Sequence, residues 1–242
     1  MNFKFLKIIA VTLTCILGFN ICSNAISQAK ETTFQDGVEF NGYLIKDNLT
    51  EDFNLSESDL NSKESYLTSL YANASIDKSS VSKKTIIDND KLYNVINYMI
   101  KGADIEDGSC MTLVYDTDFN IISTQYIIGQ TQNDGSILAK TISNEKIKAE
   151  IKTDSNGNVT SVSTYDDNQH KQRVSSRSWS SFFKCFDNCL SSKGVAAWLC
   201  TAIGVGCSVA CAITAGLGCI ACISGIGAVS TVTIKNCASK CK

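Results

Sequence analysis

Cysteines dominate the chemistry that this sequence of 242 residues could carry, because it holds twelve of them and a single histidine. Nine cysteines follow Lys184 in a short C-terminal segment. Thiols at this density form disulfides in an oxidising compartment or bind metal in a reducing one. The nine are Cys185, Cys189, Cys200, Cys207, Cys211, Cys219, Cys222, Cys237 and Cys241. The compartment to which the chain is sent therefore decides between the two chemistries.

The first 25 residues have the composition of a cleaved secretory signal. Lys4 and Lys7 precede an apolar run over residues 8–19, and Ser23 and Ala25 place small residues at positions −3 and −1 of a cleavage site. The run is shorter than a transmembrane helix requires. We therefore expect cleavage after Ala25 and a secreted, extracellular protein in which paired cysteines are oxidised.

The cysteine spacing favours disulfides between short helices. Residues four apart lie on one face of a helix, so such a pair points toward a neighbouring helix rather than toward itself. One arrangement joins Cys185 to Cys241 and Cys189 to Cys237, which clasps the two ends of the tail together; sequence alone leaves other pairings open. Nine is an odd number, so one thiol stays reduced, pairs between chains or joins Cys110. The pairs with C-x-x-x-C spacing are 185/189, 207/211 and 237/241.

Motifs for catalysis or cofactor binding are incomplete. Cys219 and Cys222 form a C-x-x-C pair without the second such pair of a zinc knuckle. The stretch GLGCIA at 216–221 matches a dinucleotide fingerprint, but no acidic residue follows it. The only histidine, His170, lies in a polar segment, and no G-x-S-x-G occurs. We therefore expect no enzyme activity, no metal and no cofactor.

Charge divides the chain into two parts. Residues 180–242 carry five lysines and one aspartate, so the remainder is acidic within a net charge of −2. The basic residues of the tail are few and flank an uncharged run at 194–234 rather than forming a stripe, which argues against nucleic-acid binding. An acidic part and a basic, apolar part indicate two pieces with separate roles.

The acidic part divides further. Residues 26–85 are polar with weak periodicity and predict a low-order lead-in. Residues 86–166 predict an α+β domain: a helix from Asp90 to Gly102, with apolar residues three and four apart, and then four or five antiparallel strands. The sequences DTDFN, QTQNDG and DSNGN read as the turns. In KIKAEIK, the alternation places Ile147, Ala149 and Ile151 on one face and lysines on the other, which predicts a half-solvated sheet.

Residues 167–180 read as a polar connector between this domain and the tail. They contain His170 and the only two arginines, Arg173 and Arg177. The simplest interpretation is a solvated linker. An exposed basic connector is also where proteolysis is easiest, so we expect a processing site here. Residues 181–242 then form a small, mainly helical, hydrophobic domain that is stapled by disulfides because it buries too little surface to fold firmly without them.

The tail resembles the halocin C-eight-like class of bacteriocins. The resemblance rests on CFDNC, WLCTAIGVGCSVAC, GLGCIACISGIG and NCASKC, which cover about a quarter of the chain. It implies a precursor whose cysteine-rich antimicrobial peptide, residues 181–242, is released as an antibiotic in a defence response against competing cells. The resemblance also suggests that the front part protects the producer as an immunity partner. The tail peptide has a net positive charge and an uncharged central run, so we expect the membrane of the target cell to be its partner.

Two other functions remain open from the sequence. Residues 195–234 are long enough for a membrane hairpin, which would make the chain an exported structural protein anchored by its tail. A hydrolase with an unrecognised site is the third hypothesis.

Overall fold

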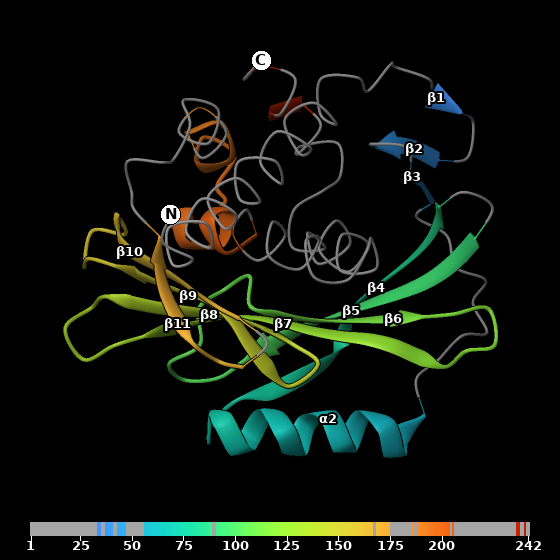
Figure 1. Cartoon of the computed structure of the whole chain (residues 1–242), viewed down its shortest axis with the longest axis horizontal. Coiled ribbons are helices and arrows are strands. Elements are labelled where there is room, and N and C mark those ends of the chain that lie inside the picture. Colours follow the sequence, from blue (N-terminus) through green and yellow to red (C-terminus); the bar gives the residue numbers. More distant parts are fainter. Residues whose placement is uncertain are drawn as a thin grey trace, which may run out of the picture.

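The computed structural model places an antiparallel sheet between a helix and the cysteine-rich tail (Figure 1). It describes residues 33–34, 37–40, 43–46, 56–88, 91–166, 168–174, 185, 188–203, 205, 236–237 and 240. The expected signal at residues 1–25 and most of the uncharged run of the tail therefore lie outside the described residues.

The sheet is a simple meander in which every strand pairs antiparallel with its neighbours in sequence. Eight strands make up its body: β4 (Ser75–Asp88), β5 (Lys91–Lys101), β6 (Cys110–Tyr115), β7 (Ile121–Thr131), β8 (Ile137–Ser143), β9 (Lys146–Thr153), β10 (Val159–Tyr165) and β11 (Lys171–Val174). Three short strands extend it beyond β4: β1 (Thr33–Phe34), β2 (Gly37–Phe40) and β3 (Tyr43–Lys46). The antiparallel sheet expected from the sequence is confirmed.

An aspartate organises three of the hairpin turns in the same way. Asp116, Asp154 and Asp166 each accept hydrogen bonds from the backbone N–H groups two and four residues later, at 2.8–3.0 Å. The fourth residue of each turn, such as Gly157, has a positive φ, as a bulged five-residue hairpin requires. The turns expected at DTDFN, QTQNDG and DSNGN are found, and DDNQH forms one more.

Helix α2 (Glu57–Leu70) covers one face of the sheet (Figure 1). Ser56 caps its N-terminus by accepting a hydrogen bond from the Asp59 N–H at 3.2 Å. Leu60 and Leu67 of the helix are buried with apolar and aromatic side chains of the sheet. That cluster includes Ile96, Tyr98, Ile100, Met111, Leu113, Tyr115, Tyr126, Ile128 and Ile142.

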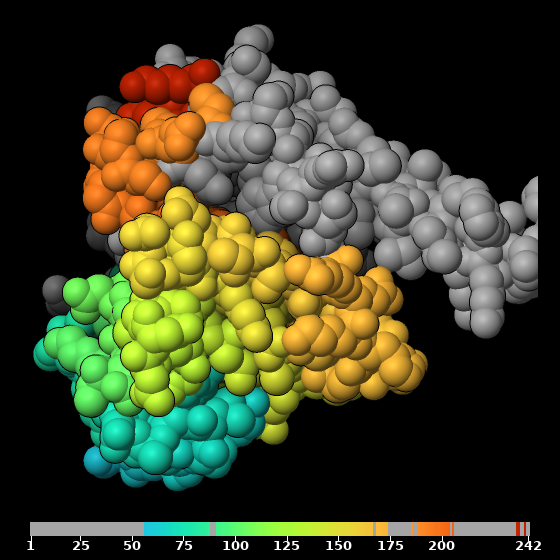
Figure 2. Space-filling view, turned by 90° about the vertical axis from the view of Figure 1, so that its left-hand side faces the viewer, coloured from blue at the N-terminus to red at the C-terminus, as the bar shows by residue number. Residues whose placement is uncertain are grey.

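The tail covers the opposite face, so the sheet is the middle of three layers. Residues 188–191 and 197–203 are helical, and Leu190, Trp198 and Leu199 share a core with Ile127 and Ile151 of the sheet. In Figure 2 the helix and the tail lie on opposite sides of the strands. The described part of the tail thus shares its core with the sheet instead of forming a core of its own.

The helix expected at 90–102 is wrong, because these residues form strand β5. Val95 and Ile96 are followed four residues later by Met99 and Ile100. These two adjacent pairs fit one face of a helix, but they also fit a strand that is buried on both faces. Ile96 and Ile100 pack on the α2 side, whereas Met99 packs on the tail side. A strand that is covered on both faces loses the alternation by which strands are recognised.

The sheet is also larger than expected, and its faces are not half-solvated. The expected lead-in at 26–85 contains α2 and most of β4, so the α+β unit begins well before residue 86. Ala149 and Ile151 pack toward the tail as one face, but Ile147 packs on the α2 side. A register shift between β8 and β9, at Thr141/Ile142, turns Ile147 to the other face.

We predict that Leu67→Ala lowers the free energy of unfolding by about 2–4 kcal/mol, because Leu67 is fully buried against the sheet. Leu70→Ala is the matched control in the same helix, since the Leu70 side chain is 45% exposed, and it should change stability by less than about 0.5 kcal/mol. Denaturant unfolding followed by circular dichroism measures both. Equal effects of the two substitutions would show that α2 does not pack through Leu67.

A second prediction concerns alkaline pH. Burial, followed by the negative charge of Glu150, raises the pKa of Tyr71 from 10 to about 12. The neutral phenol is therefore favoured in the folded state, and the stability it confers is complete below pH 10 and is lost as the pH rises through 12. We expect Tyr71→Phe to unfold at a higher alkaline pH than the parent chain, as followed by circular dichroism. An unchanged alkaline midpoint would contradict this.

Candidate functional interface between the sheet and the tail

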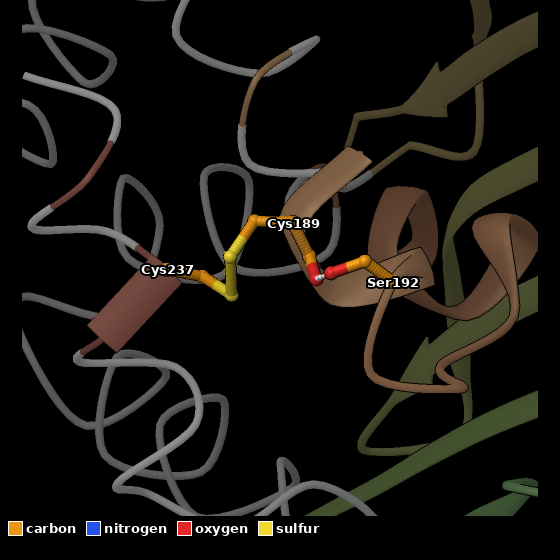
Figure 3. The surroundings of a disulfide bond; sticks show 3 residues. All are labelled: Cys189, Ser192 and Cys237. Atoms are coloured by element: carbon orange, nitrogen blue, oxygen red, sulfur yellow. Dashed lines mark hydrogen bonds between the residues drawn. A yellow bond between two sulfur atoms is a disulfide. The ribbon is translucent and has the colours of Figure 1, made fainter.

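A disulfide closes the described part of the tail on itself. The sulfur atoms of Cys189 and Cys237 are 2.07 Å apart, and their Cα atoms are 5.5 Å apart (Figure 3). This confirms the pairing expected for these two cysteines. Beside it, the Ser192 hydroxyl donates a hydrogen bond of 2.7 Å to the carbonyl of Cys189 (Figure 3). Both cysteines belong to the tail, so the bond holds the tail's shape without linking it to the sheet.

The other expected disulfide is tested only at one end. Cys185 is disulfide-bonded, whereas Cys241 lies outside the described residues, so their pairing stays a prediction. The same holds for every pairing within the uncharged run. Its four cysteines, Cys207, Cys211, Cys219 and Cys222, also lie outside the described residues.

Two further cysteines are buried where the sheet meets the tail. Cys110 of β6 and Cys200 of the tail are thiols, and each is 1% exposed in the core that the two parts share. Burial raises the pKa of the Cys110 thiol to about 12, so at neutral pH it is protonated. A protonated, inaccessible thiol is a poor nucleophile, and Cys110 therefore contributes to the shared core rather than to nucleophilic chemistry.

The contact between tail and sheet is apolar. Leu190, Trp198 and Leu199 of the tail are almost completely buried, and each belongs to the core cluster that also contains strand residues. The tail contributes Ala202, Ile203 and Val205 as well, and the sheet contributes Ile127, Ala139, Ala149, Ile151 and Val162. Burial of a large apolar side chain contributes about 1.5–3 kcal/mol, so this surface holds the tail firmly.

Two glycines of the sheet unit make room for consecutive side chains of the tail. A Cβ atom added at Gly129 would lie 2.8–3.0 Å from three atoms of the Trp198 indole ring. A Cβ atom at Gly108 would lie 2.7 Å from Leu199 Cδ2. Gly108 has a φ of +94°, which favours glycine on its own, but Gly129 lies within β7 with an ordinary backbone. Glycine weakens a strand interior, so its presence at 129 is explained by the indole that rests on it.

Two buried polar groups of the tail lack a hydrogen-bond partner among the described residues. Across the contact, the Thr141 hydroxyl donates a hydrogen bond of 3.4 Å to the carbonyl of Ala202. The indole N–H of Trp198 and the hydroxyl of Thr201 are buried and have no hydrogen-bond partner among the described residues. An unsatisfied buried polar group costs about 1–3 kcal/mol, so docking carries a penalty that the apolar contact must offset.

The residues expected at the processing site are not gathered in one place. His170 belongs to the last hairpin turn, where its Nδ1 is 3.0 Å from Asp166 Oδ2, and its side chain is exposed. Arg173 lies in β11 opposite Ser163 of β10. Arg177 lies outside the described residues. The expected connector at 167–180 therefore begins later than the sequence suggested, since β11 continues the sheet to Val174.

Sequence reasoning missed Trp198, Leu199 and Gly129 as interface residues. The tail residues 198, 199, 202 and 203 repeat with helical spacing and were open to recognition as one apolar stripe. An isolated glycine in the strand-like sequence YIIGQT is a known signal for close approach of another group. Neither signal indicates that Gly129 and Trp198 contact each other.

The described residues contain no group of three or more His, Cys, Asp or Glu side chains placed to hold a metal ion. Within the same residues, no helix has the length and apolar character needed to cross a membrane. Comparison with protein-family models, with curated proteins and with solved structures found no match to this chain.

We predict that Cys189→Ser and Cys237→Ser lower the stability of the chain to similar extents. The bond closes a loop with a sequence separation of 48, and the chain-entropy relation gives about 4 kcal/mol for such a loop. The double variant should lose little beyond either single change, because both substitutions remove one bond. Thermal unfolding and protease resistance are the measurements.

Peptide mapping under non-reducing conditions provides the control for this prediction. A fragment in which Cys189 is linked to Cys207, Cys211, Cys219 or Cys222 would show that the pairing is different. Losses that add in the double variant would show that the two cysteines act separately.

Proposed function

We propose that this chain is the precursor of a secreted bacteriocin. Its cysteine-rich C-terminal peptide is released and inhibits competing cells, and the part before it holds the peptide as an immunity partner. The observation that supports this best is the apolar docking of Trp198 and Leu199 on the sheet. An antimicrobial peptide that acts through an apolar surface is harmless to its producer while that surface is covered.

Charge and composition support a lipid membrane as the target. Residues 180–242 carry a net charge of +4, and the run at 194–234 is uncharged. Cationic peptides with a large apolar surface bind anionic lipid and insert at the boundary between headgroups and acyl chains. The apolar side chains that the sheet covers would then be the ones that insert into the membrane.

The alternative is an exported protein anchored by a membrane hairpin at 195–234, which the uncharged run favours. In that protein, residues 197–205 would lie in the bilayer, whereas here the described residues 197–203 and 205 pack on the sheet or within the tail. Fractionation separates the two functions. Full-length protein in washed membranes, with no tail peptide in the medium, would favour the anchor.

We predict that culture medium contains a peptide that begins between residues 175 and 184 and includes the tail through Lys242. A cut before residue 175 would have to open β11, whose residues pair with β10 from Lys171 to Val174. Intact-mass analysis measures the product, and the purified peptide should inhibit a sensitive strain that the uncut chain leaves unaffected. Finding only an uncut chain from about Ile26, or an inactive peptide, would contradict the proposal.

Two arginines offer a matched pair for the processing step. We expect Arg177→Gln to reduce the yield of released peptide at least tenfold, because it removes the arginine that follows the sheet. Arg173→Gln should leave the yield unchanged, since Arg173 is held within β11. Quantitative mass spectrometry of the medium measures both, and the reverse order would place the cut inside the last hairpin.

A further inference from the structure

Cutting the connector does not by itself separate the tail from the sheet. The two parts are held by an apolar core that includes Leu190, Trp198 and Leu199, and none of these contacts depends on the connector. The described disulfide links the tail to itself. Release therefore requires something that competes for the same side chains.

The docked state is well packed but leaves buried polar groups of the tail unsatisfied. The Trp198 ring fills the space above Gly129, yet its indole N–H and the Thr201 hydroxyl have no partner among the described residues. At the surface of a bilayer, an indole ring rests among apolar groups while its N–H reaches the headgroups and water. A lipid surface therefore offers the apolar contact of the sheet together with the missing partners.

We infer that a lipid surface, rather than proteolysis alone, takes the tail from the sheet, and that Gly129 sets how strongly the sheet retains it. This inference rests on the proposed function and deepens it. The sheet and the bilayer compete for one surface of the tail, centred on Trp198, and the two bound states exclude each other. Anionic lipid is the preferred acceptor, because it attracts the positive charge of the tail.

Trp198 reports directly on the exchange. The chain has two tryptophans, so Trp179→Phe in the full chain leaves Trp198 as the only indole. Vesicles of phosphatidylglycerol and brominated phosphatidylcholine quench an indole that enters the bilayer. We expect quenching to rise with lipid concentration once the connector has been cut, and vesicles without the anionic lipid should require a higher concentration for half-quenching.

Gly129→Ala tests the role of the glycine. The added methyl group meets the rigid indole ring at 2.8–3.0 Å, and overpacking of this kind weakens a contact about tenfold or more. The variant should therefore be half-quenched at about one tenth of the lipid concentration. Gly102→Ala is the matched control, because its methyl group would meet the carbonyl of Asn73 and not the tail. It should lower the melting temperature without changing the lipid concentration at half-quenching.

A compensating substitution, in which a smaller side chain replaces Trp198, keeps the test valid if Gly129→Ala also destabilises the sheet. Trp198→Leu removes the ring atoms that meet the new methyl group, so it should restore retention in the Gly129→Ala chain. Retention is measured on a full chain in which a recognition site for a sequence-specific protease replaces residues 175–181. After cleavage, the two pieces should co-elute in size-exclusion chromatography, separate for Gly129→Ala and co-elute again for the double variant.

The outcomes distinguish this inference from the proposed function. If the pieces separate on cleavage without lipid, or if brominated lipid never quenches Trp198, the inference is wrong. If the peptide still kills cells in that case, the bacteriocin function stands and a protein receptor is the target. If lipid displaces the sheet but the released peptide harms no cell, the inference stands and the proposed function is wrong.

Discussion

A sheet with two apolar faces must be covered on both, and one layer of strands cannot shield either from water. Helix α2 covers one face through Leu60 and Leu67, and the tail covers the other through Leu190, Trp198 and Leu199. The connections from β6 to β11 are short, and three of them are aspartate-organised turns, so they supply no covering layer. The covering layers come from the segment between β3 and β4, which forms α2, and from the tail that follows β11.

The two covering layers differ in chemistry. The α2 side contains many tyrosines, among them Tyr71, Tyr98, Tyr115 and Tyr126, and the Tyr66 ring lies 5.5 Å from the Tyr126 ring. Among the residues that the structure describes, the tail side contains aliphatic side chains, Trp198 and cysteines. Helix α2 reaches its strand β4 through a short turn, whereas the tail follows the last strand and is joined to the sheet by one connector. Helix α2 therefore has strands of the sheet on both sides of it in the chain, whereas the tail follows the last described strand.

How much of this could be predicted from the sequence depends on whether a signal is local. The aspartate turns were predictable, because Asp154 and Gly157 act on their own hairpin. The Cys189–Cys237 bond was predictable from helical spacing at the two ends of the tail. Strand β5 was not, since a strand buried on both faces presents the same apolar pairs as a helix. Ile147 was misplaced because a register shift, which the sequence does not reveal, turned it to the other face.

The interface could not be predicted, because neither Gly129 nor Trp198 indicates an interface unless the other is known to lie against it. Gly129 in a strand and Trp198 in an apolar helix each have ordinary explanations in isolation, and no rule of sequence spacing relates positions 69 residues apart. The cysteines, by contrast, drew attention to the tail as an independent unit. The disulfide within the tail and the apolar contact beneath it have complementary consequences. The covalent bond fixes the shape of the tail, whereas the apolar contact with the sheet can be broken without breaking a bond.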